Sequence, residues 1–259
     1  MPGTGSSPPD GFRRPRVPRE LLAALALILI VLAVFRGVTA NDFVHYDDVQ
    51  NIVNNPNVRG LSAESLRWMF TDTTYAPRYM PLGWFCYALE RELFGLRPDL
   101  WHAGNLLVHV LNTLLLFAVL RQVVLFALHR RPPGASPASA HGGEDAGRVA
   151  TWCGALGALW WAVNPLRVEP VAWASARIYA VALGFALVWL WAWLRAQAAP
   201  TEASRRFHSW ISLAAFAASL LTYPLALCAP VVLFALDVYP LRRAPLSLRG
   251  WFGRAAWPL

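Results

Sequence analysis

One uninterrupted apolar run, LLAALALILIVLAVF, starts at Leu21 and constrains this chain more than any other feature. With its flanks it reaches the roughly 20 residues that an α-helix needs to cross about 30 Å of hydrocarbon. The composition agrees, since 56% of the 259 residues are hydrophobic and 15% are charged, whereas soluble domains carry about 25% charged residues. We therefore predict an integral membrane protein.

Further apolar segments indicate that the chain crosses the bilayer repeatedly. They lie at about 101–128, 149–163, 180–194, 209–221 and 225–239, which gives six predicted spans. The basic residues are all arginine and gather in alternate connections, including the segment before the first run. Because basic residues favour the cytoplasmic side, we expect a cytoplasmic N-terminus. This arrangement fits a bacterial inner (plasma) membrane.

The predicted domain organisation follows from these segments. We expect a disordered basic tail at 1–19, a transmembrane domain at 20–243 and an interfacial segment at 244–259, where the membrane core could be truncated. Within the domain, 40–100 is predicted to be extracytoplasmic and the low-complexity linker 129–148 cytoplasmic. A cleaved signal peptide is the alternative for the first run, because VTA before Asn41 resembles a small-residue cleavage site.

The extracytoplasmic stretch is polar and contains two expected helices. SAESLRWMF is predicted to be a short helix with Ser62 as its N-cap, and MPLGWFCYALERELFG a second, amphipathic helix on the bilayer surface. Before them, FVHYDDVQ places Asp47 and Asp48 side by side. These carboxylates are either ordinary loop charges or acid/base groups held at the membrane surface.

A polar stripe runs along the second predicted span. His102, Asn105, His109 and Asn112 fall within an arc of roughly 80° on a helix. Polar groups inside a bilayer are expensive and need partners. We expect Asn105, His109 and Asn112 to form hydrogen bonds between helices, whereas His102 could face a site.

The predicted topology brings three outward-facing turns to one surface. They carry Asp47 and Asp48, Arg167 with Glu169, Arg177 with Tyr179, and Tyr223. A carboxylate can accept a proton from a hydroxyl, and an arginine can hold a phosphate. This combination suits transfer of a group from a phosphate carrier. Ordinary loop charges near lipid headgroups would give the same residue pattern.

Several motifs, in order, resemble a known family. They are NDFVHYDDVQNIVNNPNVRGLSAESLRWMFTDT, MPLGWFCYALERELFGLRPDLWHAGNLLVHVLNTLLLF, NPLRVEPVAWAS and LTYPLALCAPVVLFALDVYPLRR. From about Asn41 to Arg243 the chain resembles the O-mannosyltransferase-like membrane domain of tetratricopeptide-repeat proteins. That family belongs to the GT-C superfamily of glycosyltransferases, which use polyprenyl-phosphate sugars.

The resemblance implies an all-α, GT-C-like bundle of about six spans, with two interfacial helices in the first outer loop. It implies that Asp47 or Asp48 is the general base, and that a sugar moves, with inversion, from a polyprenyl-phosphate donor to a hydroxyl of a protein or glycan acceptor. Glu169 stands where the family has a glutamate after the third span, which implies a role in orienting the acceptor or a cation, and His102 matches a family histidine that opens the second span. Arg177 becomes the leading contact to the donor phosphate.

The chain departs from the family pattern in three motifs that carry cationic or acidic residues. The family's Glu-Arg-Lys-Asp-like run reads Ala176-Arg177-Ile178-Tyr179 here, and its Lys-Pro reads Tyr223-Pro224. The arginine before Pro-Leu is replaced by Met80, with Arg78 two positions earlier. These losses leave a non-catalytic scaffold or assembly partner as the second interpretation, and a transporter as a third.

Other ligand classes receive little support from the sequence. No basic stripe with interleaved aromatic residues suggests nucleic-acid binding. The three cysteines are far apart and form no CxxC motif, so neither a disulfide framework nor a zinc site is expected. The oxygens of Asp47 and Asp48 could bind a divalent cation, and no other cofactor is expected.

Overall fold

The structure is a computed structural model, and it describes residues 18–75, 78–129 and 143–241. The expected interfacial segment at 244–259, nearly all of the N-terminal tail and most of the linker at 129–148 lie outside these residues. Within the described residues all regular secondary structure is helical and no strand occurs. The prediction of an all-α protein is confirmed for this part of the chain.

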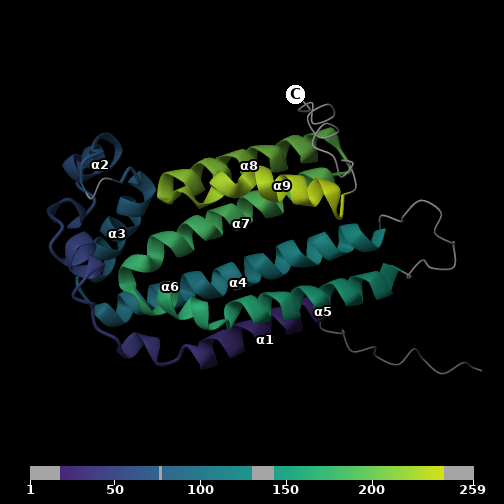
Figure 1. Ribbon diagram of the computed structural model, residues 1–259, viewed down its shortest axis with the longest axis horizontal. Coiled ribbons are helices and arrows are strands. Elements are labelled where there is room, and N and C mark those ends of the chain that lie inside the picture. The colour runs from purple at the N-terminus through teal and green to yellow at the C-terminus, as the bar shows by residue number, and fades with distance from the viewer. Residues whose placement is uncertain (1–17, 76–77, 130–142, 242–259) are drawn as a thin grey trace, which may run out of the picture.

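Helices α1, α4, α5, α7, α8 and α9 run lengthwise in Figure 1, and α2 and α3 lie at one end. The α-helices are α1 (Arg19–Val34), α2 (Ala63–Thr71), α3 (Pro81–Phe94), α4 (Pro98–His129), α5 (Gly143–Ala162), α6 (Val168–Ala172), α7 (Arg177–Gln197), α8 (Glu202–Thr222) and α9 (Ala229–Val238). Short turns connect them: η1 (Val38–Ala40), η2 (Val49–Val53), η3 (Pro56–Val58), η5 (Pro165–Arg167), η6 (Ala174–Ala176) and η7 (Pro224–Cys228).

Three helical segments among the described residues are long and apolar enough to cross a membrane: Arg19–Ala40, Pro98–His129 and Ala174–Gln197. A fourth is possible if α8 and the η7–α9 segment, bent by 117°, count as one span. The other long helices are less apolar at their starts, since charged residues occupy the first turns of α5 and α8. The structure thus describes an integral membrane protein with three or four candidate spans, and six spans stay a prediction.

Successive long helices reverse direction, so their connections fall at two ends of the bundle (Figure 1). One end collects residues 35–75, 78–97, 163–176 and 223–228, and we call it the capped end. Helix α4 packs against α5 and α7, α7 packs against α8, and α1 packs against α4 and α5. The three turns that were expected to converge therefore lie at one end of the bundle, and their extracytoplasmic orientation stays a prediction.

Helices α2 and α3 are the two helices expected in the first loop, and we call them together the cap. Ser62 caps α2 as predicted, because its hydroxyl oxygen accepts a hydrogen bond from the Ser65 amide at 3.0 Å. An apolar cluster that includes Met69, Trp84 and Tyr87 joins the cap to Trp101 of α4 and Ile178 of α7. The cap therefore shares a core with the ends of the bundle helices.

The polar stripe on α4 is buried and partnered, as the sequence predicted for most of it. Each residue bonds to a main-chain carbonyl of another segment: His102 Nε2 to Asp42 (3.4 Å), Asn105 Nδ2 to Trp173 (2.7 Å), His109 Nε2 to Ala162 (3.0 Å) and Asn112 Nδ2 to Ala180 (2.7 Å). Hydrogen bonds of this kind hold helices together where no water competes. The stripe thus fixes α4 against its neighbours.

A buried ion pair joins the cap to the bundle. Arg177, at the start of α7, is 5% exposed and pairs with Glu90 of α3, which is 6% exposed. Its Nε donates to Asn105 Oδ1 at 2.8 Å, and its other terminal nitrogen donates to the Trp101 carbonyl. All three guanidinium nitrogens therefore have partners within the protein.

The ion pair depends on the absence of a side chain at Gly104. A Cβ there would lie 2.6 Å from both terminal nitrogens of Arg177 and 2.8 Å from Glu90 Oε1. We expect Gly104→Ala to lower the free energy of unfolding by about 1–3 kcal/mol, as overpacking does, despite the better helix propensity of alanine. Thermal unfolding of the detergent-solubilised protein, followed by tryptophan fluorescence, measures this change.

Gly147→Ala is the matched control, because Gly147 is also helical and an added Cβ meets nothing within 4 Å. It should leave stability unchanged or raise it by up to about 1 kcal/mol. Equal midpoints for the two variants would show that Gly104 is not needed to accommodate the ion pair.

Candidate functional site

The two adjacent carboxylates of the first loop lie in different environments. Asp48 is fully buried, whereas Asp47 is half-buried. Both lie where the chain enters the helical turn η2. The sequence treated them as equivalent, and the structure separates them.

Asp48 is held by backbone amides on both of its oxygens. Oδ2 accepts a hydrogen bond from the Val44 amide at 2.9 Å, and Oδ1 accepts one from the Ser175 amide at 2.8 Å. The Ser175 carbonyl in turn accepts a hydrogen bond from the Tyr87 hydroxyl at 2.5 Å. Burial raises the pKa of Tyr87 well above its ordinary value, so this phenol stays a neutral donor. Asp48 therefore ties the first loop to η6.

Asp47 belongs to a cluster of side chains from four segments of the capped end. Tyr179 at the start of α7 and Tyr223 before η7 pack edge to face, with ring centroids 4.6 Å apart. Asp47 and Arg78 both lie close enough to Tyr179 to interact with it electrostatically. We call Asp47, Arg78, Tyr179 and Tyr223 the four-residue cluster. The structure thus brings together three residues that the sequence proposed for the site and adds Tyr179.

The remaining predicted site residues lie apart from this cluster. Arg177 is buried in its ion pair, and His102 is buried, with Nδ1 lacking a hydrogen-bond partner among the described residues. Arg167 stacks on Trp161 at 5.3 Å, and Glu169 is exposed on α6. In the described part of the chain neither Arg167 nor Glu169 forms an ion pair or a hydrogen bond between side chains with the cluster.

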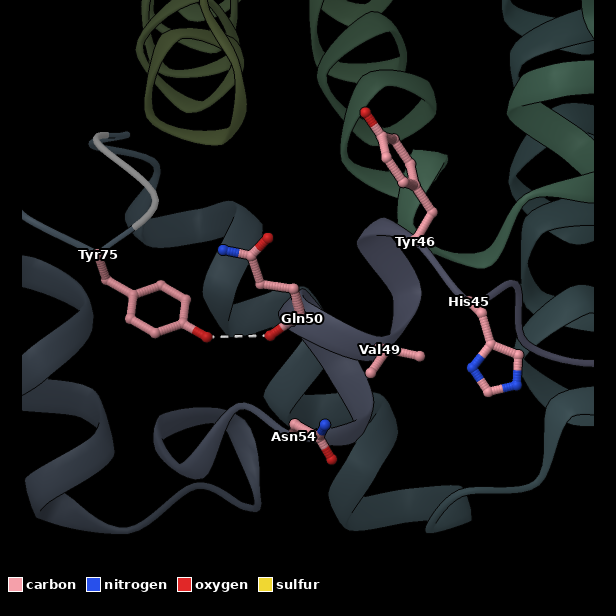
Figure 2. Close-up of a pocket in the computed structure, with 6 residues that line it drawn as sticks. All are labelled: His45, Tyr46, Val49, Gln50, Asn54 and Tyr75. Carbon is pink, nitrogen blue, oxygen red and sulfur yellow. Dashed lines mark hydrogen bonds between the residues drawn. The ribbon is translucent and has the colours of Figure 1, made fainter.

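An open cleft of about 400 Å³ is lined in part by residues that are close to Asp47 in the sequence. It is lined by His45, Tyr46, Val49, Gln50, Asn54 and Tyr75 (Figure 2). The Tyr75 hydroxyl donates to the Gln50 carbonyl at 2.9 Å, so the side-chain amide of Gln50 is left free among the described residues. Burial raises the pKa of Tyr75. The lining carries aromatic rings and amides but no carboxylate or arginine, which suits a neutral, hydroxylated ligand.

The residues of the site do not form a recognisable metal centre. Among the described residues no three His, Cys, Asp or Glu side chains are grouped to hold a metal ion. Both oxygens of Asp48 already accept hydrogen bonds from amides. The two carboxylates therefore do not fit a shared divalent-cation site.

Two residues that the structure singles out by their contacts, Glu90 and Tyr179, received no role from the sequence. Glu90 was one acidic residue among several in an amphipathic helix, and only the contact with Arg177 distinguishes it from Glu92. Tyr179 was placed on the correct side but received no role. A signal existed for Tyr179, because it and Tyr223 stand at two of the positions where the chain departs from the family pattern.

Comparison with known proteins gives partial similarity to one kind of enzyme. The chain is 35% identical over 125 residues to the mouse protein O-mannosyl-transferase TMTC1, covering 44% of this chain and 13% of the mouse protein. It is 40% identical over 85 residues to the human TMTC1, covering 29% of this chain and 9% of the human protein. No family model and no solved structure matches the chain. These similarities suggest a glycosyltransferase role.

The unequal burial of the two carboxylates predicts unequal stability effects. Asp48→Asn leaves one buried amide without an acceptor, and this should lower the free energy of unfolding by about 1–3 kcal/mol. Asp47→Asn should change it by less than about 0.5 kcal/mol, as expected away from such contacts. Thermal unfolding of both variants in the same detergent checks the difference. Equal losses would contradict the structural role of Asp48.

Proposed function

We propose that this chain forms the membrane part of a glycosyltransferase that moves a sugar from a polyprenyl-phosphate donor to a hydroxyl acceptor. The observation that carries the proposal is the four-residue cluster at the capped end: two phenols pack together, and a partly exposed carboxylate and an exposed arginine interact electrostatically with one of them. The partial similarity to protein O-mannosyl-transferases supports the same reaction class. A GT-C fold, as the sequence motifs imply, belongs to this proposal.

Asp47 is the proposed general base. Its carboxylate accepts the proton from the acceptor hydroxyl as the acceptor oxygen attacks the anomeric carbon of the sugar. The bond between that carbon and the phosphate oxygen breaks, and polyprenyl phosphate leaves with the bonding electron pair. Attack from the side opposite the phosphate inverts the configuration. Asp48 is unsuited to this role because its oxygens are occupied and buried.

The open cleft of Figure 2 is the proposed approach for the acceptor. Four of its lining residues, His45, Tyr46, Val49 and Gln50, lie within three residues of Asp47 along the chain. Aromatic faces pack against apolar surfaces, and amides both donate and accept hydrogen bonds. These groups can therefore hold a protein or glycan acceptor beside the base.

The membrane orientation follows from the arginine-rich connections. If the N-terminus is cytoplasmic, the capped end faces outward and the reaction occurs on the outer face of a bacterial inner membrane. The apolar candidate spans fit a lipid bilayer, which would also hold the polyprenyl chain of the donor.

A non-catalytic scaffold is the second candidate, and one observation favours it. Two of the charged residues proposed for catalysis from the sequence, Asp48 and Arg177, are consumed by contacts that hold the cap in place. The transporter interpretation has less support, because the polar stripe on α4 is satisfied by carbonyls of neighbouring segments.

Replacement of the base tests the enzyme hypothesis. Asp47→Asn should reduce sugar transfer from a radiolabelled polyprenyl-phosphate sugar by about 10²–10⁴-fold, the usual contribution of general base catalysis. The assay is run on membranes in which the protein level is matched by immunoblotting. Retention of full transfer by Asp47→Asn would overturn the assignment.

Asp42→Asn is the matched control, since Asp42 is an exposed carboxylate of the same loop and lies outside the cluster. It should transfer sugar at the rate of the unmodified protein. If the unmodified protein transfers no sugar from any such donor, the scaffold interpretation gains support.

A further inference from the structure

The cation that would hold a donor phosphate is not the one that the sequence suggested. Every guanidinium nitrogen of Arg177 has a partner inside the protein. Its removal from Glu90 would leave a buried carboxylate uncompensated, which is strongly unfavourable. Arg177 therefore cannot turn toward a ligand without disrupting the junction between cap and bundle.

Arg78 is differently placed. It is exposed, it stands just before α3, and it forms no ion pair with a carboxylate in the described part of the chain. It is also one of the groups that interact electrostatically with Tyr179. An arginine that interacts with one of two paired phenols can supply further donors to the same anion.

The two phenols are fixed with respect to each other. Tyr179 lies in the first turn of α7 and Tyr223 between α8 and η7, yet their ring centroids are 4.6 Å apart with an angle of 87° between the ring planes. Edge-to-face packing of this kind is a favourable arrangement for aromatic pairs. Each phenol can donate one hydrogen bond, and both rings are only partly buried. The pair is therefore preformed and accessible.

We propose that Arg78, Tyr179 and Tyr223 bind the phosphate group of the lipid-linked substrate and of the polyprenyl phosphate that leaves. The inference rests on the proposed function and specifies which side chains hold the leaving group. Hydrogen bonds from arginine to phosphate are charge-assisted and strong. One guanidinium balances the single negative charge of a sugar-phosphate diester, and two neutral hydroxyl donors hold its remaining oxygens without adding charge.

The same placement gives the cluster a division of roles. The Asp47 carboxylate lies near the same phenol as Arg78, so a sugar between the base and the phosphate site would contact both. Tyr179 and Tyr223 are then positioning residues for the leaving group. Their loss should weaken binding of a phosphate-bearing lipid more than binding of the corresponding alcohol.

Binding of farnesyl phosphate, a short polyprenyl phosphate, tests this inference on the full chain in nanodiscs of zwitterionic lipid. Isothermal titration calorimetry should show saturable binding to the unmodified protein, and clearly weaker binding of farnesol. Tyr179→Phe and Tyr223→Phe keep the aromatic rings and should each weaken farnesyl phosphate binding about tenfold, the loss of one hydrogen bond to a charged group. Arg78→Gln should weaken it more.

Two control variants separate a local effect from a general one. Arg67→Gln removes another exposed arginine of the cap, and Tyr79→Phe removes a phenol hydroxyl that bonds to the Phe70 carbonyl, outside both the cluster and the cleft. Both should bind farnesyl phosphate as the unmodified protein does. Thermal midpoints close to that of the unmodified protein would show that the variants at Tyr179 and Tyr223 are folded.

The outcomes distinguish this inference from the proposed function. Farnesyl phosphate binding that is equal in all variants would overturn the phosphate site and leave the enzyme hypothesis standing. Weaker binding in the three cluster variants, with sugar transfer unaffected by Asp47→Asn, would keep the site and overturn the catalytic role of Asp47. Competition by phosphatidic acid as strong as that by farnesyl phosphate would overturn the donor site and identify a general headgroup site.

Discussion

The burial of one guanidinium group organises the capped end of this protein. Removing a charge from water costs several kcal/mol unless good partners replace the water, and Arg177 has them in Glu90, Asn105 and the Trp101 carbonyl. These partners belong to α3 and α4, while Arg177 begins α7. The arrangement therefore fixes the cap helix against two bundle helices at once. Gly104 supplies the space, because a larger residue would occupy the position of the guanidinium.

Each member of the four-residue cluster stands within two residues of a buried residue in the sequence. Asp47 precedes Asp48, which is bound to η6, and Tyr179 follows Arg177 by two residues. Tyr223 follows the fully buried Thr222, and Arg78 precedes the buried Met80 by two residues. Buried groups with satisfied contacts thus determine where the accessible groups lie. A site built in this way is preorganised, since its positions do not depend on the ligand.

Sequence periodicity made much of the helical bundle predictable, whereas the burial of individual residues at the capped end could not be predicted. The spacing of His102, Asn105, His109 and Asn112 indicated one helix face, and the structure buries that face. The apolar segments became helices near their expected bounds, and alternation of direction placed three turns together. The difference between Asp47 and Asp48 could not be read from adjacent positions. It arises from amides of Val44 and Ser175, and Ser175 lies 127 residues away from Asp48 in the sequence.

The energetics of the buried ion pair also constrain where a phosphate can bind. Breaking such a pair by removing one partner costs about 3–5 kcal/mol, and a phosphate that captured Arg177 would impose a comparable cost on Glu90. The same phosphate at Arg78 displaces only water and leaves the junction intact. A catalyst must hold the leaving group through repeated turnovers while the cap stays in place. Arg78, which is exposed and interacts with one of the paired phenols, could hold the leaving group without disturbing the cap. Arg177 keeps the cap in place but has no nitrogen left for a phosphate.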